Sequence, residues 1–109
     1  SGPEPRIWGS MAYDKSSGRM ILFGGGTDLI DSDPKRSLGD TWEWDGRSWT
    51  LINDIALLPR EMITMTYDAR RRKMVWFGGI SKETGESVGF NDTYVLSNVN
   101  SGKIVMTPQ

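Results

Sequence analysis

The sequence lacks two residue types that carry much of protein chemistry, because its 109 residues contain no histidine and no cysteine. Without histidine the chain has neither the commonest general base nor the commonest zinc or copper ligand. Without cysteine it has no disulfide, so its composition says nothing about the redox compartment. Any catalysis would depend on Asp, Glu, Lys, Arg, Tyr or Ser.

A strong net charge and long apolar runs are also missing. Thirteen basic and fourteen acidic residues give a formal net charge of −1, so no strong field attracts nucleic acid or an anionic membrane. No apolar run approaches the ~20 residues that a transmembrane helix needs. The first residues, SGPEP, have neither the charge nor the apolar stretch of a signal peptide. We therefore expect no nucleic-acid partner and no membrane partner, and the sequence leaves the compartment open.

Tryptophan and glycine are abundant instead. Five Trp in so short a chain favour an all-β protein with aromatic side chains packed between sheets, and thirteen Gly indicate many tight turns. The length corresponds to a single domain.

An internal repeat organises the chain. The run MAYD at 11–14 recurs as MTYD at 65–68, and MILFGG at 20–25 recurs as MVWFGG at 74–79, both with an offset of 54 residues. The motif GDTW at 39–42 recurs as NDTY at 91–94 with an offset of 52. The change in offset lies in a polar stretch, 26–38 in the first copy, which predicts a loop because strands cannot absorb length changes without a shift in register.

Each copy divides into four short strands, predicted in the first copy at about 9–13, 19–24, 39–44 and 48–52. Asp45-Gly46 between the last two indicates a tight hairpin, because glycine accepts the positive φ of a type I′ turn. The apolar runs 20–23 and 74–77 predict strands that are buried on both faces.

At these residues the sequence resembles the kelch repeat, whose signature is a hydrophobic run ending in Gly-Gly, a variable loop and two spaced aromatic residues. The first copy supplies Trp42 and Trp49 as the aromatic pair, which the resemblance assigns to packing between blades. The second copy supplies Tyr94, whereas Val105 aligns with Trp49, so the final blade is degenerate, truncated or exchanged.

The resemblance implies an all-β fold of two four-stranded antiparallel propeller blades, at about 5–53 and 59–109, within one unit 1–109. Two blades leave two apolar outer faces uncovered. We therefore expect a closed homo-oligomer, with a trimer of six blades favoured over a tetramer of eight. Loops 26–38 and 80–90 follow the same strand of each blade, so they should form one composite surface on one rim.

Six residues are candidates for binding: Arg6 and Arg60 at equivalent positions, Trp8, and the acidic cluster Asp28, Asp31 and Asp33. The repetition of the two arginines favours a structural role, with a guanidinium holding carbonyls or a carboxylate of a neighbouring blade. The acidic residues match no known calcium-loop spacing, so we expect no metal site. Trp8 has Met62 as its counterpart and is therefore the tryptophan that best suits ligand binding.

The basic run 70–73 lies between two predicted strands and indicates an exposed hairpin tip, with contact to phosphate or to an acidic partner as the alternative. No nucleophile–base pair and no cofactor motif is recognisable. The sequence therefore favours a binding or scaffold module for a protein or carbohydrate ligand. The alternatives are a carbohydrate-acting propeller enzyme, or a propeller fragment with no function beyond assembly.

Overall fold

The computed structural model describes residues 2–27, 37–52, 59–81, 88–97 and 105–108. Within them lie ten β-strands and no helix, arranged as two four-stranded antiparallel sheets and one two-stranded sheet. Consequently no helix in the described part of the chain could cross a membrane. The predicted all-β class is confirmed.

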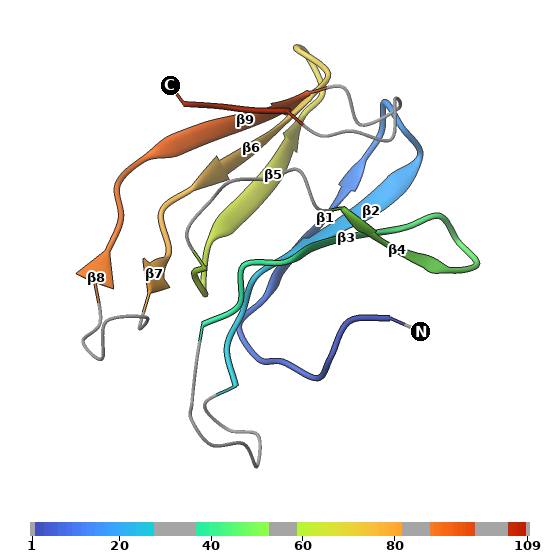
Figure 1. Ribbon diagram of the computed structural model, residues 1–109. Helices are drawn as coiled ribbons and strands as arrows, with labels where there is room; N and C mark the ends of the chain where they lie inside the picture. The colour runs from blue at the N-terminus through green and yellow to red at the C-terminus, as the bar shows by residue number, and fades with distance from the viewer. Residues whose placement is uncertain (1, 28–36, 53–58, 82–87, 98–104, 109) are drawn as a thin grey trace.

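The first sheet is a meander in which neighbours along the chain are neighbours in the sheet (Figure 1). Its strands are β1 (Ser10–Asp14), β2 (Arg19–Phe23), β3 (Thr41–Trp44) and β4 (Trp49–Ile52). All four were predicted from the sequence, with bounds that agree to within two residues. Short turns connect β1 to β2 and β3 to β4, whereas the polar stretch 26–38 separates β2 from β3.

The predicted hairpin at Asp45-Gly46 is confirmed, but its turn is not of type I′. Four residues, 45–48, connect β3 to β4, and Gly46 alone among them has a positive φ, of 100°. The Asp45 carboxylate accepts hydrogen bonds from the backbone N–H groups of Arg47 (2.8 Å) and Ser48 (2.9 Å). This Asx-type bonding stabilises a wider turn than the dipeptide predicts.

The second sheet repeats this arrangement with the strand order β5, β6, β9, β10. Its strands are β5 (Thr64–Asp68), β6 (Lys73–Phe77), β9 (Thr93–Ser97) and β10 (Val105–Pro108). Ser10 lies opposite Phe23 in the first sheet and Thr64 lies opposite Phe77 in the second, so both strands are offset by 54 residues. Between β3 and β9 the offset is 52. The repeat is therefore present in the strand register as well as in the sequence.

Two details of the second copy differ from expectation. The segment expected as loop 80–90 contains a short hairpin of β7 (Ile80–Ser81) and β8 (Val88–Gly89). The fourth strand pairs with β9 so that Met106, and not Val105, is the counterpart of Trp49. Aligning two turn glycines misplaces this strand by one residue, because pairing with β9 sets the register. The second copy therefore has a fourth strand and is not truncated.

The two sheets pack against each other around one core. Strands β1 and β5 contact each other at the inner edges of the sheets (Figure 1). Phe23 of the first sheet meets Trp76 of the second with ring centroids 4.4 Å apart. The buried core consists of Ile21, Phe23, Ile52, Ile63, Met65, Met74, Trp76 and Leu96.

Strands β2 and β6 were expected to be buried on both faces, and each is buried on one. In β2, Ile21 and Phe23 are fully buried, whereas Met20 and Leu22 are only partly covered. In β6, Phe77 is 49% exposed although Trp76 is fully buried. The reason is geometric: each sheet has one neighbouring sheet in the chain, which covers one of its two faces.

Candidate functional site

Arg6 and Arg60 make three equivalent hydrogen bonds in the two copies. The Arg6 guanidinium donates to the Gly24 carbonyl (3.0 Å) and to both carboxylate oxygens of Asp40 (2.7 and 2.9 Å). The Arg60 guanidinium makes the equivalent bonds in the second copy. Each arginine thus spans the base of the segment between the second and third strands of its own sheet.

Arg60 donates to the Gly78 carbonyl (3.0 Å) and to the two oxygens of Asp92 (2.8 and 3.4 Å). Its side chain is 2% exposed, and the Phe90 ring lies over the guanidinium at 3.9 Å from the ring centroid. A planar guanidinium suits this task, because it can bond a carboxylate with two N–H groups while donating to a carbonyl.

The carboxylate of the first copy is held in its ionised form. Partial burial of Asp40 raises its pKa, but the hydrogen bonds from Arg6 and from the Trp42 indole N–H (2.7 Å), together with the Arg6 charge, outweigh this effect. The pKa of Asp40 therefore lies below its ordinary value of 3.8. The ion pair and the Trp42 bond together keep the start of β3 in place.

The structural role foreseen for the two arginines is supported by these contacts, but their partners differ from expectation. Within the part of the chain that the structure describes, the carbonyl and the carboxylate that each guanidinium holds belong to its own copy. Antiparallel pairing explains this, because the segment leading into the first strand lies beside the segment that leaves the second. A role for Arg6 or Arg60 in ligand binding remains a prediction.

The stems of the two long connections meet at one end of the sheets. The Arg60 N–H donates to the Leu38 carbonyl (3.0 Å), and the Gly25 N–H donates to the Arg60 carbonyl (3.1 Å). The described stem residues of both connections lie at the lower end of the molecule in Figure 1. The backbone that leads into the second sheet therefore joins the two stems in one surface, which we call the loop rim.

Glu61 is a buried carboxylate in the loop rim that was not among the predicted site residues. It is fully buried, and the Ser37 hydroxyl donates to its Oε2 atom (3.1 Å). A Cβ atom at Gly26 would collide with this carboxylate, so a larger residue there would require the Glu61 side chain to move. The first copy has Ile7 at the equivalent position. This exchange of an apolar residue for a charged one is the sequence feature that could have identified Glu61 as a candidate site residue.

Trp8 is exposed, as a binding residue must be, and its backbone conformation is unusual. Trp8 and its counterpart Met62 have φ values of 58° and 59°, in the left-handed region that non-glycine residues seldom adopt. The Met62 N–H donates to the Trp8 carbonyl (2.8 Å), and both side chains are nearly half exposed. The two equivalent positions thus meet beside the loop rim and present apolar side chains to solvent. Ligand binding by Trp8 remains a prediction.

The acidic cluster Asp28, Asp31 and Asp33 lies outside the described residues. Among the residues that are described, no group of three or more Asp or Glu side chains is placed to hold a metal ion.

The first sheet has an apolar face that turns away from the second sheet. Leu22 pairs with Trp42, and Trp42 with Leu51, on the side opposite to Ile21 and Phe23. This open face of the first sheet carries Met11, Tyr13, Met20, Leu22, Trp42, Trp44, Trp49 and Leu51. Trp42 and Trp49, expected between blades, therefore do not pack between the two sheets of this chain.

The second sheet also has an open face, on the side away from the core. By the same alternation it carries Thr64, Thr66, Val75, Phe77, Thr93 and Val95. The repeat relates these surfaces in a specific way. Trp76 of the core corresponds to Leu22 of the first open face, and Phe23 of the core corresponds to Phe77 of the second open face. The two sheets therefore pack head to tail, and each open face is the counterpart of a face that is buried in the core.

Comparison with known proteins finds no matching family model and no matching curated protein. The resemblance to the kelch repeat consequently depends on the residues of this chain alone.

Proposed function

We propose that this chain supplies two consecutive blades of a kelch-type β-propeller, and that further copies of the chain complete a ring that works as a binding or scaffold module. The observation that carries the proposal is the head-to-tail packing of the two sheets. The open face of the first sheet is the counterpart of a surface that already accepts a sheet. The open face of the second sheet is the counterpart of the surface that packs on it.

A second copy can therefore use contacts that the chain already contains. The buried Phe23–Trp76 contact has a direct equivalent between chains, in which Phe77 of one copy meets Leu22 of the next. Phe77 is 49% exposed in the single chain, and Met11 on the receiving face is 53% exposed. Burying such side chains stabilises an assembly by about 1.5–3 kcal/mol for each fully covered residue.

The stoichiometry follows from the number of sheets in the chain. Two blades per chain require an even total, and propellers have roughly 4–8 blades. A trimer with six blades is favoured, and a tetramer with eight is the alternative. The loop rim would then recur once per chain around one end of the ring, where connections 26–38 and 80–90 present variable residues to a ligand.

Two substitutions test the head-to-tail contact separately from the fold. Met11→Asp places a charge on the open face of the first sheet, and Phe77→Asp places one on the open face of the second. Neither side chain belongs to the core cluster. Arg47→Asp, in the exposed turn before β4, is the matched control because it introduces the same carboxylate away from both faces.

Light scattering should give three times the 12.2 kDa chain mass for the natural sequence and for Arg47→Asp, and a single chain for each face variant. Mixing the two face variants should produce a one-to-one dimer, because the intact face of each variant can pack against the intact face of the other. A folded natural chain that stays monomeric at micromolar concentration would refute self-assembly. Face variants that dissociate but fail to complement each other would refute the head-to-tail arrangement.

A further inference from the structure

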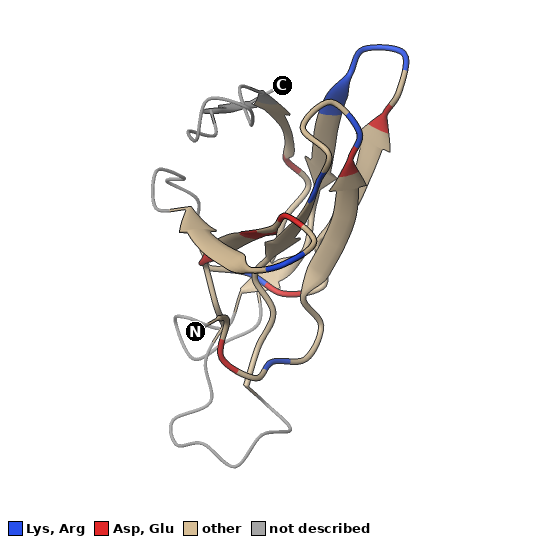
Figure 2. Cartoon of the chain, turned by 90° about the vertical axis from the view of Figure 1, so that its right-hand side faces the viewer, with Lys and Arg blue, Asp and Glu red and all other residues tan. Residues whose placement is uncertain are grey.

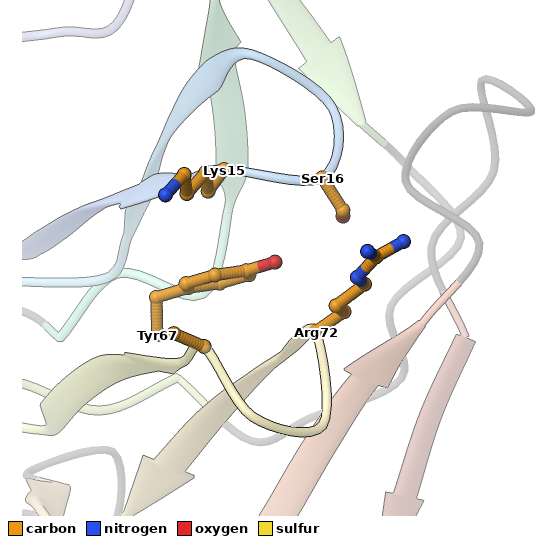
Figure 3. A pocket seen from close by; sticks show the side chains of 5 residues that line it. Lys15, Ser16, Tyr67 and Arg72 are labelled. Carbon is orange, nitrogen blue, oxygen red and sulfur yellow. The ribbon is translucent and has the colours of Figure 1, made fainter.

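A cleft opens between the two hairpin turns at the end of the molecule opposite to the loop rim. One wall is the β1–β2 turn and the other is the β5–β6 turn with the end of β5 (Figure 3). The cleft has a volume of about 490 Å³ and is lined by Lys15, Ser16, Tyr67, Ala69 and Arg72. Protein clefts of roughly 300–1,000 Å³ accommodate small molecules, so there is room for more than an inorganic ion.

The cations that line the cleft are not neutralised by nearby carboxylates. Among the described residues, no ion pair involves Lys15 or Arg72. Asp14 is buried and accepts the hydrogen bond of the Ser16 hydroxyl (2.6 Å), so Ser16 holds the turn. Asp68 pairs with Arg71 at 2.9 Å. Figure 2 shows the β5–β6 turn as a continuous basic segment.

The backbone of Arg72 is a second, independent observation. Its φ is 57°, in the left-handed region, whereas the first copy has Gly18 with φ 73° at the same position of the turn. Glycine takes this conformation without steric cost, so the second copy keeps a strained arginine where the first has an unstrained residue. Residues with a strained backbone of this kind are concentrated at functional sites. Figure 3 shows the Arg72 side chain on one side of the cleft and the Tyr67 hydroxyl directed into the space beside it.

We propose that this cleft binds a small organic molecule that carries an oxyanion, such as a carboxylate, sulfate or phosphate group. The Arg72 guanidinium can donate two parallel hydrogen bonds to the oxyanion. Lys15 of the opposite turn adds a positive charge at the edge of the cleft, with its ammonium turned away from Arg72 (Figure 3), and the Tyr67 hydroxyl donates a further hydrogen bond. All three groups belong to one chain, so the site does not depend on the proposed assembly.

The test is a titration followed by backbone amide NMR at constant ionic strength, adjusted with sodium chloride. The probes are inorganic phosphate, sulfate and glucuronate, with glucose as the neutral counterpart of glucuronate. Saturable shifts are expected for the amides of 15–18 and 67–72 with at least one anion. Glucose should leave them unchanged.

Variants distinguish a built site from diffuse attraction. Arg72→Gly removes the guanidinium and introduces the residue that the first copy uses, so folding should be preserved while anion affinity falls at least tenfold. Tyr67→Phe keeps the ring and should weaken binding several-fold. Arg71→Gln removes a neighbouring charge that is paired with Asp68 and does not line the cleft, and should change the affinity less than twofold.

Three results would overturn the proposal. The first is the absence of saturable shifts with every anion. The second is an equal loss of affinity in Arg71→Gln and Arg72→Gly, which would mean that only the total charge of the turn matters. The third is binding of glucose as strong as that of glucuronate, which would mean that no oxyanion is recognised.

Discussion

Two Arg–Asp pairs of nearly equal length but different burial should differ strongly in their contribution to stability. The Arg60–Asp92 pair is 2.8 Å long and the Arg71–Asp68 pair is 2.9 Å long, yet the arginine side chains are 2% and 72% exposed. Distance alone would predict the same contribution from both pairs. Burial predicts a large difference, because water replaces the lost partner at the surface and cannot do so in the interior.

The magnitude for Arg60→Ala follows from what the truncation leaves behind. It removes charge-assisted hydrogen bonds to Asp92, worth about 1.5–3 kcal/mol, and deprives the Gly78 carbonyl of this donor. It also removes the contact with the Phe90 ring, worth about 1 kcal/mol. Asp92 is about one-third exposed and can rehydrate, which lowers the total. We expect a loss of about 3 kcal/mol, against ~0.5 kcal/mol or less for Arg71→Ala.

Urea unfolding followed by tryptophan fluorescence at one fixed protein concentration measures both values, with the free energy extrapolated linearly to water. Arg60→Lys should lose most of the same free energy, because an ammonium cannot form the two-pronged contact. In a double-mutant cycle, Arg60→Ala and Asp92→Ala should show a coupling of about 1–3 kcal/mol. Equal losses for Arg60→Ala and Arg71→Ala would contradict the assignment of Arg60 as a buried clamp.

Two further predictions concern the same region. Gly24→Ala should destabilise the fold by about 3 kcal/mol or more, because Gly24 has φ 67° and a Cβ atom there would collide with the Arg60 carbonyl. Gly46→Ala should cost only about 1 kcal/mol, because no atom lies close to the position of its Cβ. Similar losses for the two variants in urea unfolding would refute the steric argument. The lowered pKa of Asp40 means that its ionised form stabilises the fold above its ordinary value of 3.8, and that this contribution decreases as pH falls below that value. The stability difference between the natural chain and Asp40→Asn should therefore shrink between pH 5 and pH 3, and a constant difference would show that Asp40 titrates normally.

The repeat made the strands predictable from sequence. A single apolar run such as 20–23 is ambiguous between a strand and a buried helical turn. Four residues that end in Gly-Gly are too short for a helix, and the second copy repeats this pattern at the same offset, so both runs were predicted as strands. The repeat also located the loop, since the offset changes there and nowhere within a strand. These are local properties of the chain, and local properties are what a pattern of residues conveys.

Properties that depend on contacts distant in sequence could not be predicted in the same way. Equivalence of Arg6 and Arg60 indicated a structural role, but the choice of Gly24 and Asp40 as partners depends on which segments antiparallel pairing brings together. A run of four basic residues does not indicate the left-handed backbone at Arg72. The run therefore predicted a solvated hairpin tip, and the cleft beside it was not predicted. The open face of the first sheet is equally hidden, because an apolar strand has the same sequence whether one face or both are covered.

The contacts of Arg6 and Arg60 also allow the connection between the second and third strands to change in length without a change in the sheet. In each copy the guanidinium joins the residue that leaves the second strand to the residue that precedes the third, so the ends of the connection are held together whatever lies between them. The entropic cost of closing a loop grows only slowly with its length. Because the two ends of the connection are held in place, a change in its length need not move the strands. The connection can therefore be lengthened, shortened or exchanged while the register is retained, as the two-residue difference between the copies illustrates. In engineering terms, the segments behind Arg6 and Arg60 are graft sites, where foreign recognition sequences can be inserted into a framework that does not need to be redesigned.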